Sequence, residues 1–139
     1  MKRKQEVAVA WAVASVCVLA QYPASVWDGV YSAEQAKRGA ALYSNECASC
    51  HGATLEGRGQ APELSGEEFT AKWDGTTVAD LFERIQSSMP ADRPGRLSAD
   101  QTAAVIAFIL SVNKFPAAAE LPGDPARLRQ IRFEAARPK

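Results

Sequence analysis

Two cysteines and a histidine at fixed spacing make up the segment of the chain best suited to chemistry. In Cys47-Ala48-Ser49-Cys50-His51, two thiols lie three residues apart and the single histidine of the chain follows directly. This C-x-x-C-H spacing is the attachment signal for c-type haem. Three residues amount to most of a helical turn, so both sulfurs can face one porphyrin edge and each can add across a vinyl group. The histidine that follows would then bind the iron through a ring nitrogen.

The same cysteines have three other interpretations. A redox dithiol usually opens a helix within a βαβ pattern, and no such pattern surrounds this pair. A structural zinc site needs four ligands, commonly from two separated pairs, and the chain offers one pair and one histidine. A simple disulfide would leave His51 without a role. We therefore expect one covalently attached haem c, bound at Cys47 and Cys50 with His51 as an iron ligand.

The second axial position of the iron needs another donor. Because no second histidine exists, Met89 is the strongest candidate: it is the only methionine after Met1, and it lies 38 residues after His51 in a Met-Pro loop that could approach the opposite haem face. The alternatives are an open or water-bound iron, or ligation by Lys72 or Lys114. We expect the metal ligands to be His51 and Met89.

Ligation by histidine and methionine predicts electron transfer rather than catalysis. A thioether favours Fe(II) and raises the reduction potential. When both axial positions are filled, substrate or oxygen has no place on the iron. The sequence therefore predicts a one-electron carrier without enzymatic activity, working between a dehydrogenase or respiratory complex and a terminal acceptor. The alternative is a haem protein with an open axial site, acting as an enzyme subunit or as a gas or redox sensor.

The N-terminal segment, residues 1–20, has the pattern of a signal peptide. Residues 2–4 are basic, residues 7–20 carry no charge, and residues 18–20 form an acceptable cleavage site. The uncharged run is short for a membrane span, which needs about 20 apolar residues. We expect export to the periplasm, where bacteria attach haem c, and no stable membrane span after cleavage. An uncleaved signal that tethers the protein is the alternative.

Composition and charge indicate an ordinary globular domain and argue against binding of nucleic acid. The chain has 139 residues, of which 47% are hydrophobic and 23% charged, as in an ordinary globular domain. Residues 21–139 hold 13 basic and 15 acidic residues, and no basic stripe that would suit nucleic acid. We divide this part into a lead-in arm (21–31), a haem domain (32–116) and a basic C-terminal extension (117–139). The extension has a net charge of +2, and we expect it to be solvated and only partly ordered.

Four N-terminal capping signals predict an all-α fold of three or four helices joined by long loops. Each is a Ser or Thr followed three residues later by a Gln, Glu or Asp, and they begin at Ser32, Ser65, Thr77 and Ser98. The first helix is expected to run to about Cys50. Gly39 lies in its middle, where a glycine usually indicates the close approach of another element. No segment alternates with the period of a strand.

Residues 32–115 resemble the class I (monohaem, mitochondrial-type) cytochromes c of bacteria. The resemblance depends on the C-x-x-C-H segment, on Met89 and on the two long helices. It implies a cytochrome c fold in which the N- and C-terminal helices cross, with Gly39, Tyr43 and Phe108 at the crossing.

The same resemblance implies further roles around the haem. Pro62, 11 residues after His51, would accept a hydrogen bond from the second ring nitrogen of that histidine through its carbonyl. Trp73 and Arg58 are candidates for contact with a haem propionate. Residues 27–31 and 34–39 are similar to those of small cytochromes associated with quinoprotein dehydrogenases, which implies such a dehydrogenase as redox partner. A terminal oxidase is the other partner expected of an electron carrier.

Overall fold

The computed structural model describes residues 25–139; the expected signal peptide and the start of the lead-in arm lie outside them. Within residues 25–139 the regular secondary structure is entirely helical, which confirms the predicted all-α class. The elements are η1 (Val26–Asp28), α1 (Ala33–Glu46), α2 (Ala48–His51), α3 (Gly66–Trp73), α4 (Val78–Ser88), α5 (Ala99–Val112) and α6 (Pro125–Leu128). None of the described helices is long and apolar enough to cross a membrane.

Three of the predicted N-terminal caps are present. The side chains of Ser32, Thr77 and Ser98 each accept a hydrogen bond from the backbone N–H three residues later. For α4 and α5 the capping box is complete, because Asp80 and Gln101 bond back to the N–H of the capping residue. These local bonds satisfy backbone donors that have no partner inside a helix, and they fix where α1, α4 and α5 begin.

The caps of α1 and α3 differ from the prediction in a way that involves distant residues. The side chain of Gln35 does not return to Ser32. It bonds instead to Leu121, donating to its carbonyl and accepting from its N–H, both at 2.8 Å. Ser65 makes no capping bond, and the Gly66 N–H donates to the side-chain carbonyl of Asn113 at 3.0 Å. Tertiary partners therefore replace the local partners at both positions.

The first helix ends earlier than predicted. α1 stops at Glu46, because Cys47 has φ −125° and ψ −36°, and α2 then resumes at Ala48. The prediction of one continuous helix to about Cys50 was therefore wrong, because the helix is interrupted at Cys47. The break falls at the first residue of the C-x-x-C-H segment.

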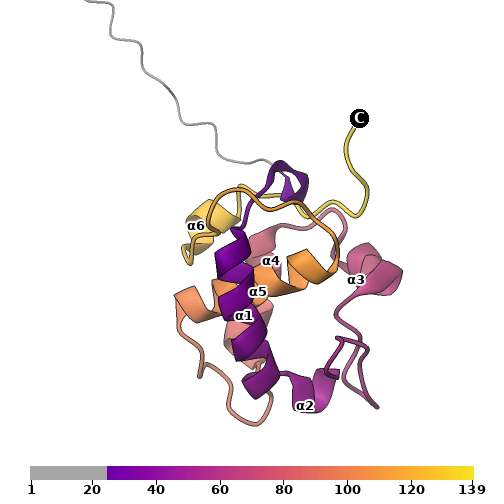
Figure 1. Cartoon of the computed structure of the whole chain (residues 1–139), viewed down its shortest axis with the longest axis vertical. Coiled ribbons are helices and arrows are strands. Elements are labelled where there is room, and N and C mark those ends of the chain that lie inside the picture. The colour runs from indigo at the N-terminus through magenta and orange to yellow at the C-terminus, as the bar shows by residue number, and fades with distance from the viewer. Residues whose placement is uncertain (1–24) are drawn as a thin grey trace, which may run out of the picture.

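The centre of the fold is the crossing of α1 over α5 (Figure 1). Gly39 lies at the contact, where a Cβ would come within 1.8 Å of the backbone oxygen of Ala104. The rings of Tyr43 and Phe108 meet beside it with centroids 5.3 Å apart. The predicted helix crossing is confirmed, with Gly39 against Ala104 and Phe108.

The C-terminal residues form part of the core, which overturns the expectation of a solvated extension. Leu121, Leu128, Ile131 and Phe133 are all less than 5% exposed. We call residues 121–134 the C-terminal strap. Its backbone bonds to the lead-in arm through Val26 N–H to Arg132 O (3.0 Å), and to α4 through Val78 N–H to Ile131 O (2.9 Å). Burial of these four apolar side chains stabilises an ordered conformation of the extension, although its net charge is positive. The expectation depended on that charge.

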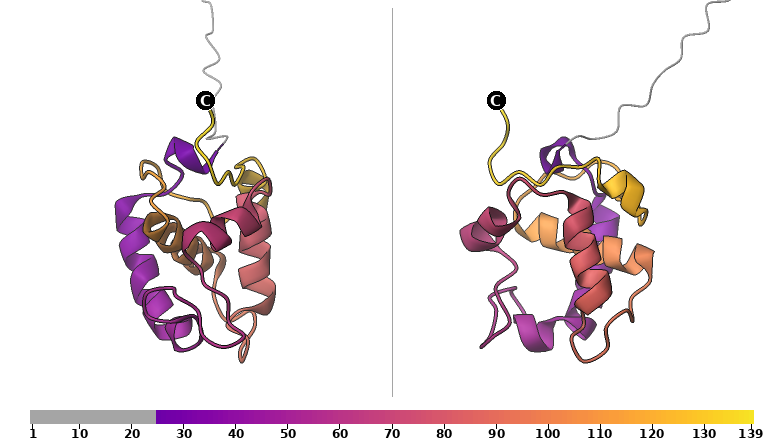
Figure 2. Two further views of the ribbon diagram at one scale, coloured as in Figure 1. Left: turned by 90° about the vertical axis from the view of Figure 1, so that its right-hand side faces the viewer. Right: turned by 180° about the vertical axis from the view of Figure 1, so that it is seen from behind.

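The strap, η1 and α6 gather at one end of the molecule, and α2 lies at the other (Figures 1 and 2). The lead-in arm is docked as well: Val26, Val30 and Tyr31 are buried, and the Trp27 indole N–H donates to Glu134 O at 2.9 Å. The two ends of the described chain thus support the helices from the side away from the C-x-x-C-H segment.

Candidate haem-binding site

The C-x-x-C-H segment forms one tight helical turn. The N–H groups of Cys50 and His51 both donate to the carbonyl of Cys47, at 3.1 and 2.9 Å. This turn keeps the two cysteines one helical turn apart, as the attachment geometry requires. Cys47 is half-buried, Cys50 is exposed, and both are free thiols rather than a disulfide.

The environment of Cys47 does not suit redox dithiol chemistry. Burial, together with the neighbouring Glu46 and Cys50, raises the pKa of the Cys47 thiol to about 11. Redox-active cysteine pairs have lowered pKa values, because the thiolate is the reacting form. A zinc site also lacks a ligand set, since no group of three or more His, Cys, Asp or Glu residues lies together in residues 25–139.

The imidazole of His51 is held in one orientation. Its ring is buried, and Nδ1 lies 2.8 Å from the carbonyl oxygen of Pro62. Because a carbonyl can only accept, Nδ1 must carry the hydrogen and donate. In the neutral ring, Nε2 then holds the lone pair and is available to a metal. The contact expected between His51 and Pro62 is thus present in the structure.

The loop after His51 is folded so that Pro62 comes back beside it. The Gly57 N–H donates to His51 O at 2.7 Å, and the Leu64 N–H donates to Leu55 O at 2.9 Å. Gly57 has φ +76°, and a Cβ there would come within 3 Å of the backbone around residues 61–63. Leu55 is buried and closes the loop from within.

Asn113 also holds this loop, and the sequence interpretation did not identify it. Its side-chain N–H group donates to Leu64 O at 3.0 Å, while its carbonyl accepts from the Gly66 N–H. The C-terminal end of α5 therefore fixes the segment that presents Pro62 to His51. The available signal was a polar residue directly after a helix that is otherwise strongly apolar.

Met89 follows α4 directly and lies at the edge of the apolar core. Its N–H caps α4 by donating to Ile85 O at 3.0 Å, and its side chain is half-buried against the core cluster. Cys47, Ala48, Leu64 and Trp73 are partly buried against the same cluster. A porphyrin joined to Cys47 would cover apolar side chains of this kind, so the donor set and its surroundings fit a haem.

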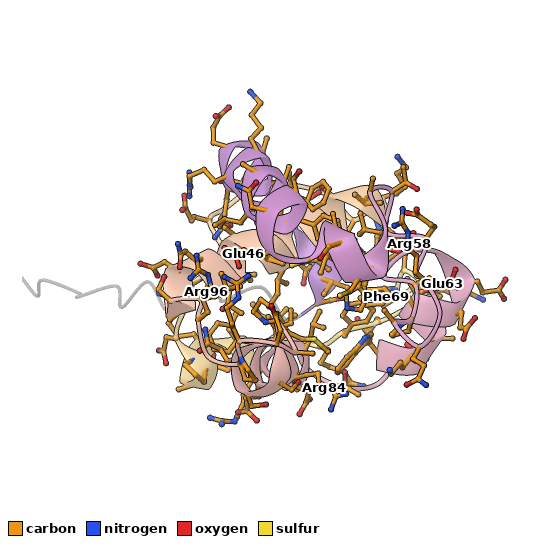
Figure 3. The ribbon with its side chains drawn as sticks, turned by 90° about the horizontal axis from the view of Figure 1, so that it is seen from below. Glu46, Arg58, Glu63, Phe69, Arg84 and Arg96 are labelled. Carbon is orange, nitrogen blue, oxygen red and sulfur yellow. The ribbon has the colours of Figure 1, made fainter. Side chains whose placement is uncertain are left out.

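The two candidates for contact with a propionate, Trp73 and Arg58, lie in α3 and in the loop after His51. Trp73 ends α3 and is half-buried, and the exposed Lys72 places its Nζ 5.9 Å from the Trp73 ring centroid. Arg58 is exposed in the loop, where its backbone pairs with Ala61, and Figure 3 shows it near Glu63. Contact of Trp73 or Arg58 with a propionate stays a prediction, as does ligation by Met89 rather than Lys72 or Lys114.

Comparison with known proteins agrees with this geometry. A family model described as cytochrome c oxidase, cbb3-type, subunit III matches residues 34–109, which is more than half of the chain. The chain belongs to this cytochrome family. Haem c is the prosthetic group that the family implies, and the cytochrome c fold expected from the sequence is confirmed.

One relative and one solved structure illustrate the extent of the similarity. The chain is 36% identical over 92 residues to the cbb3-type cytochrome c oxidase subunit CcoP of Azospirillum brasilense. That match covers 55% of the chain but only 30% of the relative. The sulfane dehydrogenase SoxCD of Paracoccus pantotrophus contains a chain with the same fold, at a TM-score of 0.51 and 24% identity. The match covers 77% of this cytochrome and 61% of the SoxCD chain.

Proposed function

We propose that this cytochrome is a periplasmic one-electron carrier with a single haem c, attached at Cys47 and Cys50 and ligated by His51 and Met89. The observation that carries the proposal is the hydrogen bond from His51 Nδ1 to Pro62 O, directly after the two cysteines. It leaves Nε2 free to bind iron from one side, while the loop after α4 supplies a thioether. When bound, the haem supplies a reversible Fe(III)/Fe(II) couple.

The surrounding residues determine what that couple can do. Pro62 fixes the His51 ring and strengthens its donation, and the thioether of Met89 favours the reduced iron. With both axial positions filled, no substrate could bind the metal, so the role is transfer of an electron and not catalysis. The exposed Cys50 lies where one haem edge would be accessible to a partner.

The partner proposed for this cytochrome is a respiratory complex. The support is the relationship to subunit CcoP, which is named as part of a cbb3-type cytochrome c oxidase. Because the match covers only 30% of that subunit, we do not extend the proposal to assembly of this chain into a whole oxidase. A quinoprotein dehydrogenase, implied by the similarity of residues 27–31 and 34–39, is the other proposed electron donor.

The test is spectroscopy on the exported, purified protein in both oxidation states. The proposal expects covalent haem in the mature polypeptide, a six-coordinate low-spin spectrum with a thioether-to-iron band, and a reversible positive midpoint potential. A high-spin oxidised spectrum with fast CO binding to the reduced protein would instead support an enzyme or sensor with an open iron. A polypeptide mass without added porphyrin would refute haem attachment altogether.

A further inference from the structure

The loop that follows Met89 is exposed along most of its length. In this segment, which we call the Met89 loop (residues 89–97), Pro90 and Leu97 are buried while residues 91–96 are exposed. Its internal backbone bonds are two tight turns, Arg93 N–H to Pro90 O at 2.9 Å and Arg96 N–H to Arg93 O at 3.3 Å. A loop with so little buried surface depends on side-chain contacts to remain in place.

One acidic side chain connects this loop to the end of α1. Glu46 accepts from the Arg96 Nε with both carboxylate oxygens, each at 3.1 Å. A terminal nitrogen of Arg93 lies 3.6 Å from the same carboxylate. The Glu46 side chain is only 12% exposed, whereas both arginines are 51% exposed. Figure 3 shows Glu46 and Arg96 side by side across the gap between α1 and the loop.

Glu46 lies next to the C-x-x-C-H segment in the chain, so its contact with the Met89 loop connects two parts of the site. Glu46 is the last residue of α1 and directly precedes Cys47, so it moves with the turn that carries both thiols and His51. Arg93 and Arg96 follow Met89 by four and seven residues. The ion pairs therefore join the segment that binds one face of the haem to the segment expected to supply the other face.

The far end of the loop has a separate attachment. The Gln86 side chain on α4 donates to Leu97 O at 3.1 Å and to the hydroxyl of Thr102 on α5. That attachment fixes where the loop joins α5 but does not reach residues 91–96. Glu46 contacts the loop at Arg93, in its middle, and at Arg96, directly before Leu97.

We propose that Glu46 is a positioning residue that keeps the Met89 loop closed, and with it the Met89 thioether on the iron. This inference rests on the proposed function, in which Met89 is the second axial ligand. A carboxylate that is mostly buried and contacts two arginines holds a loop more firmly than an exposed ion pair does. Opening of the loop must break these contacts before Met89 can leave the metal.

The test compares Glu46→Gln with a matched control, Glu83→Gln, in the haem-loaded protein. Glu83 on α4 forms an ion pair of 2.7 Å with Arg129, and both side chains are more than half exposed. That pair lies outside the Met89 loop. One readout is tryptic cleavage after Arg96, followed by mass spectrometry; cleavage after Arg93 is blocked because Pro94 follows. The other readout is the rate at which added imidazole replaces the thioether on the oxidised iron.

In Glu46→Gln we expect both rates to rise about fivefold, the effect of losing a partly buried ion pair. Glu83→Gln should leave both at the wild-type values. Adding Arg96→Gln to Glu46→Gln should raise imidazole binding little further, because the two residues act as one contact. Unchanged rates in Glu46→Gln would overturn the proposal. Faster cleavage with unchanged imidazole binding would also overturn it, since the loop would then open without releasing Met89.

The failure of the proposed function would look different. It would be visible in the wild-type protein alone, as the absence of a thioether-to-iron band before imidazole is added. The failure of the positioning role would leave that band intact and appear only in the comparison of Glu46→Gln with wild type.

Discussion

At the scale of single residues, the site depends on how the ring of His51 is held. The Pro62 carbonyl accepts from Nδ1 at 2.8 Å, and the ring is buried. A buried imidazole without this bond could rotate or exchange the positions of its hydrogen, and Nε2 would then not be reliably available. The bond comes from the backbone of the loop, so the loop conformation, rather than a proline side chain, is what the site requires.

Replacement of Met89 tests the second axial ligand. Met89→Ala should keep the haem attached, because Cys47 and Cys50 remain, while the midpoint potential falls by on the order of 100 mV or more. Met89→Leu should give the same fall, since it fills the space but supplies no sulfur. Redox titration and haem staining of a denaturing gel measure the two effects. A potential that drops in the alanine variant but not in the leucine variant would mean that Met89 contributes packing alone.

Tyr43 provides a test by pH. Its hydroxyl donates to Gly52 O at 2.7 Å, and burial, followed by the charges at Cys47 and Glu56, raises its pKa from 10.0 to about 12. Between pH 10 and 12 the unfolded chain loses this proton while the folded protein keeps it. The free energy of unfolding should therefore fall through this window, with a contribution from Tyr43. In the haem-loaded protein this contribution comes mainly from burial, because Cys47 carries no thiolate once its sulfur is bonded to haem.

In Tyr43→Phe that contribution is absent. We expect the variant to be about 1 kcal/mol less stable than wild type at neutral pH, because the bond to Gly52 is lost. Its stability should decline less steeply above pH 10. Denaturant titrations at a series of pH values, followed by circular dichroism, measure both. Parallel declines for the two proteins would show that the Tyr43 hydroxyl does not titrate differently in the folded state.

At the scale of elements, the crossing of α1 and α5 decides the fold around the site. α1 leads directly into the C-x-x-C-H turn, and Asn113, the residue that caps the end of α5, holds the loop presenting Pro62. Any change in the distance between these two helices would therefore shift the haem cysteines relative to Pro62. Gly39 is the residue that allows the close approach.

Substitution of Gly39 tests the crossing. In an isolated helix, Gly39→Ala would be stabilising by about 1 kcal/mol. Here the added Cβ would lie 1.8 Å from Ala104 O, so the helices must separate, and we expect a net loss of about 2 kcal/mol or more. The control is Ser44→Ala on the exposed face of α1, which should change stability by less than about 0.5 kcal/mol. Thermal unfolding measures both, and a stabilised Gly39→Ala variant would contradict the close packing.

The helices could be predicted from the sequence where their determinants are local. The caps at Thr77 and Ser98 involve residues three apart, and both are as expected. The cap at Ser32 is also present, but the predicted return bond of the Gln35 side chain and the predicted cap at Ser65 were wrong. The Gln35 side chain bonds to Leu121, 86 residues away, and the Gly66 N–H bonds to Asn113, 47 residues away. Nothing in a local pattern could indicate those partners. The C-x-x-C-H segment was identifiable because its chemistry depends on spacing alone.

At the scale of the whole molecule, the C-terminal strap completes a core that the haem domain alone would leave open. Its residues pack beside the lead-in arm and α4, and α4 in turn leads to Met89. The expectation of a solvated extension depended on the five basic residues after Pro116 and did not consider four apolar residues of the same segment, which are buried. Arginine side chains can remain in water while the backbone and the apolar neighbours between them are buried, so net charge does not predict exposure.

Removal of one strap side chain tests this arrangement. Phe133 is fully buried, and its ring contacts Phe69 on α3 and Phe115 after α5, with centroids 6.0 and 5.5 Å apart. Phe133→Ala should destabilise the protein by about 3 to 5 kcal/mol, because it leaves a cavity between three segments. The control is Arg132→Ala, whose side chain is exposed while its backbone carbonyl keeps the bond to Val26. It should cost less than about 1 kcal/mol. Equal, small losses in thermal unfolding of the two haem-loaded variants would mean that the strap is dispensable, and that the core is closed by the helices and the porphyrin alone.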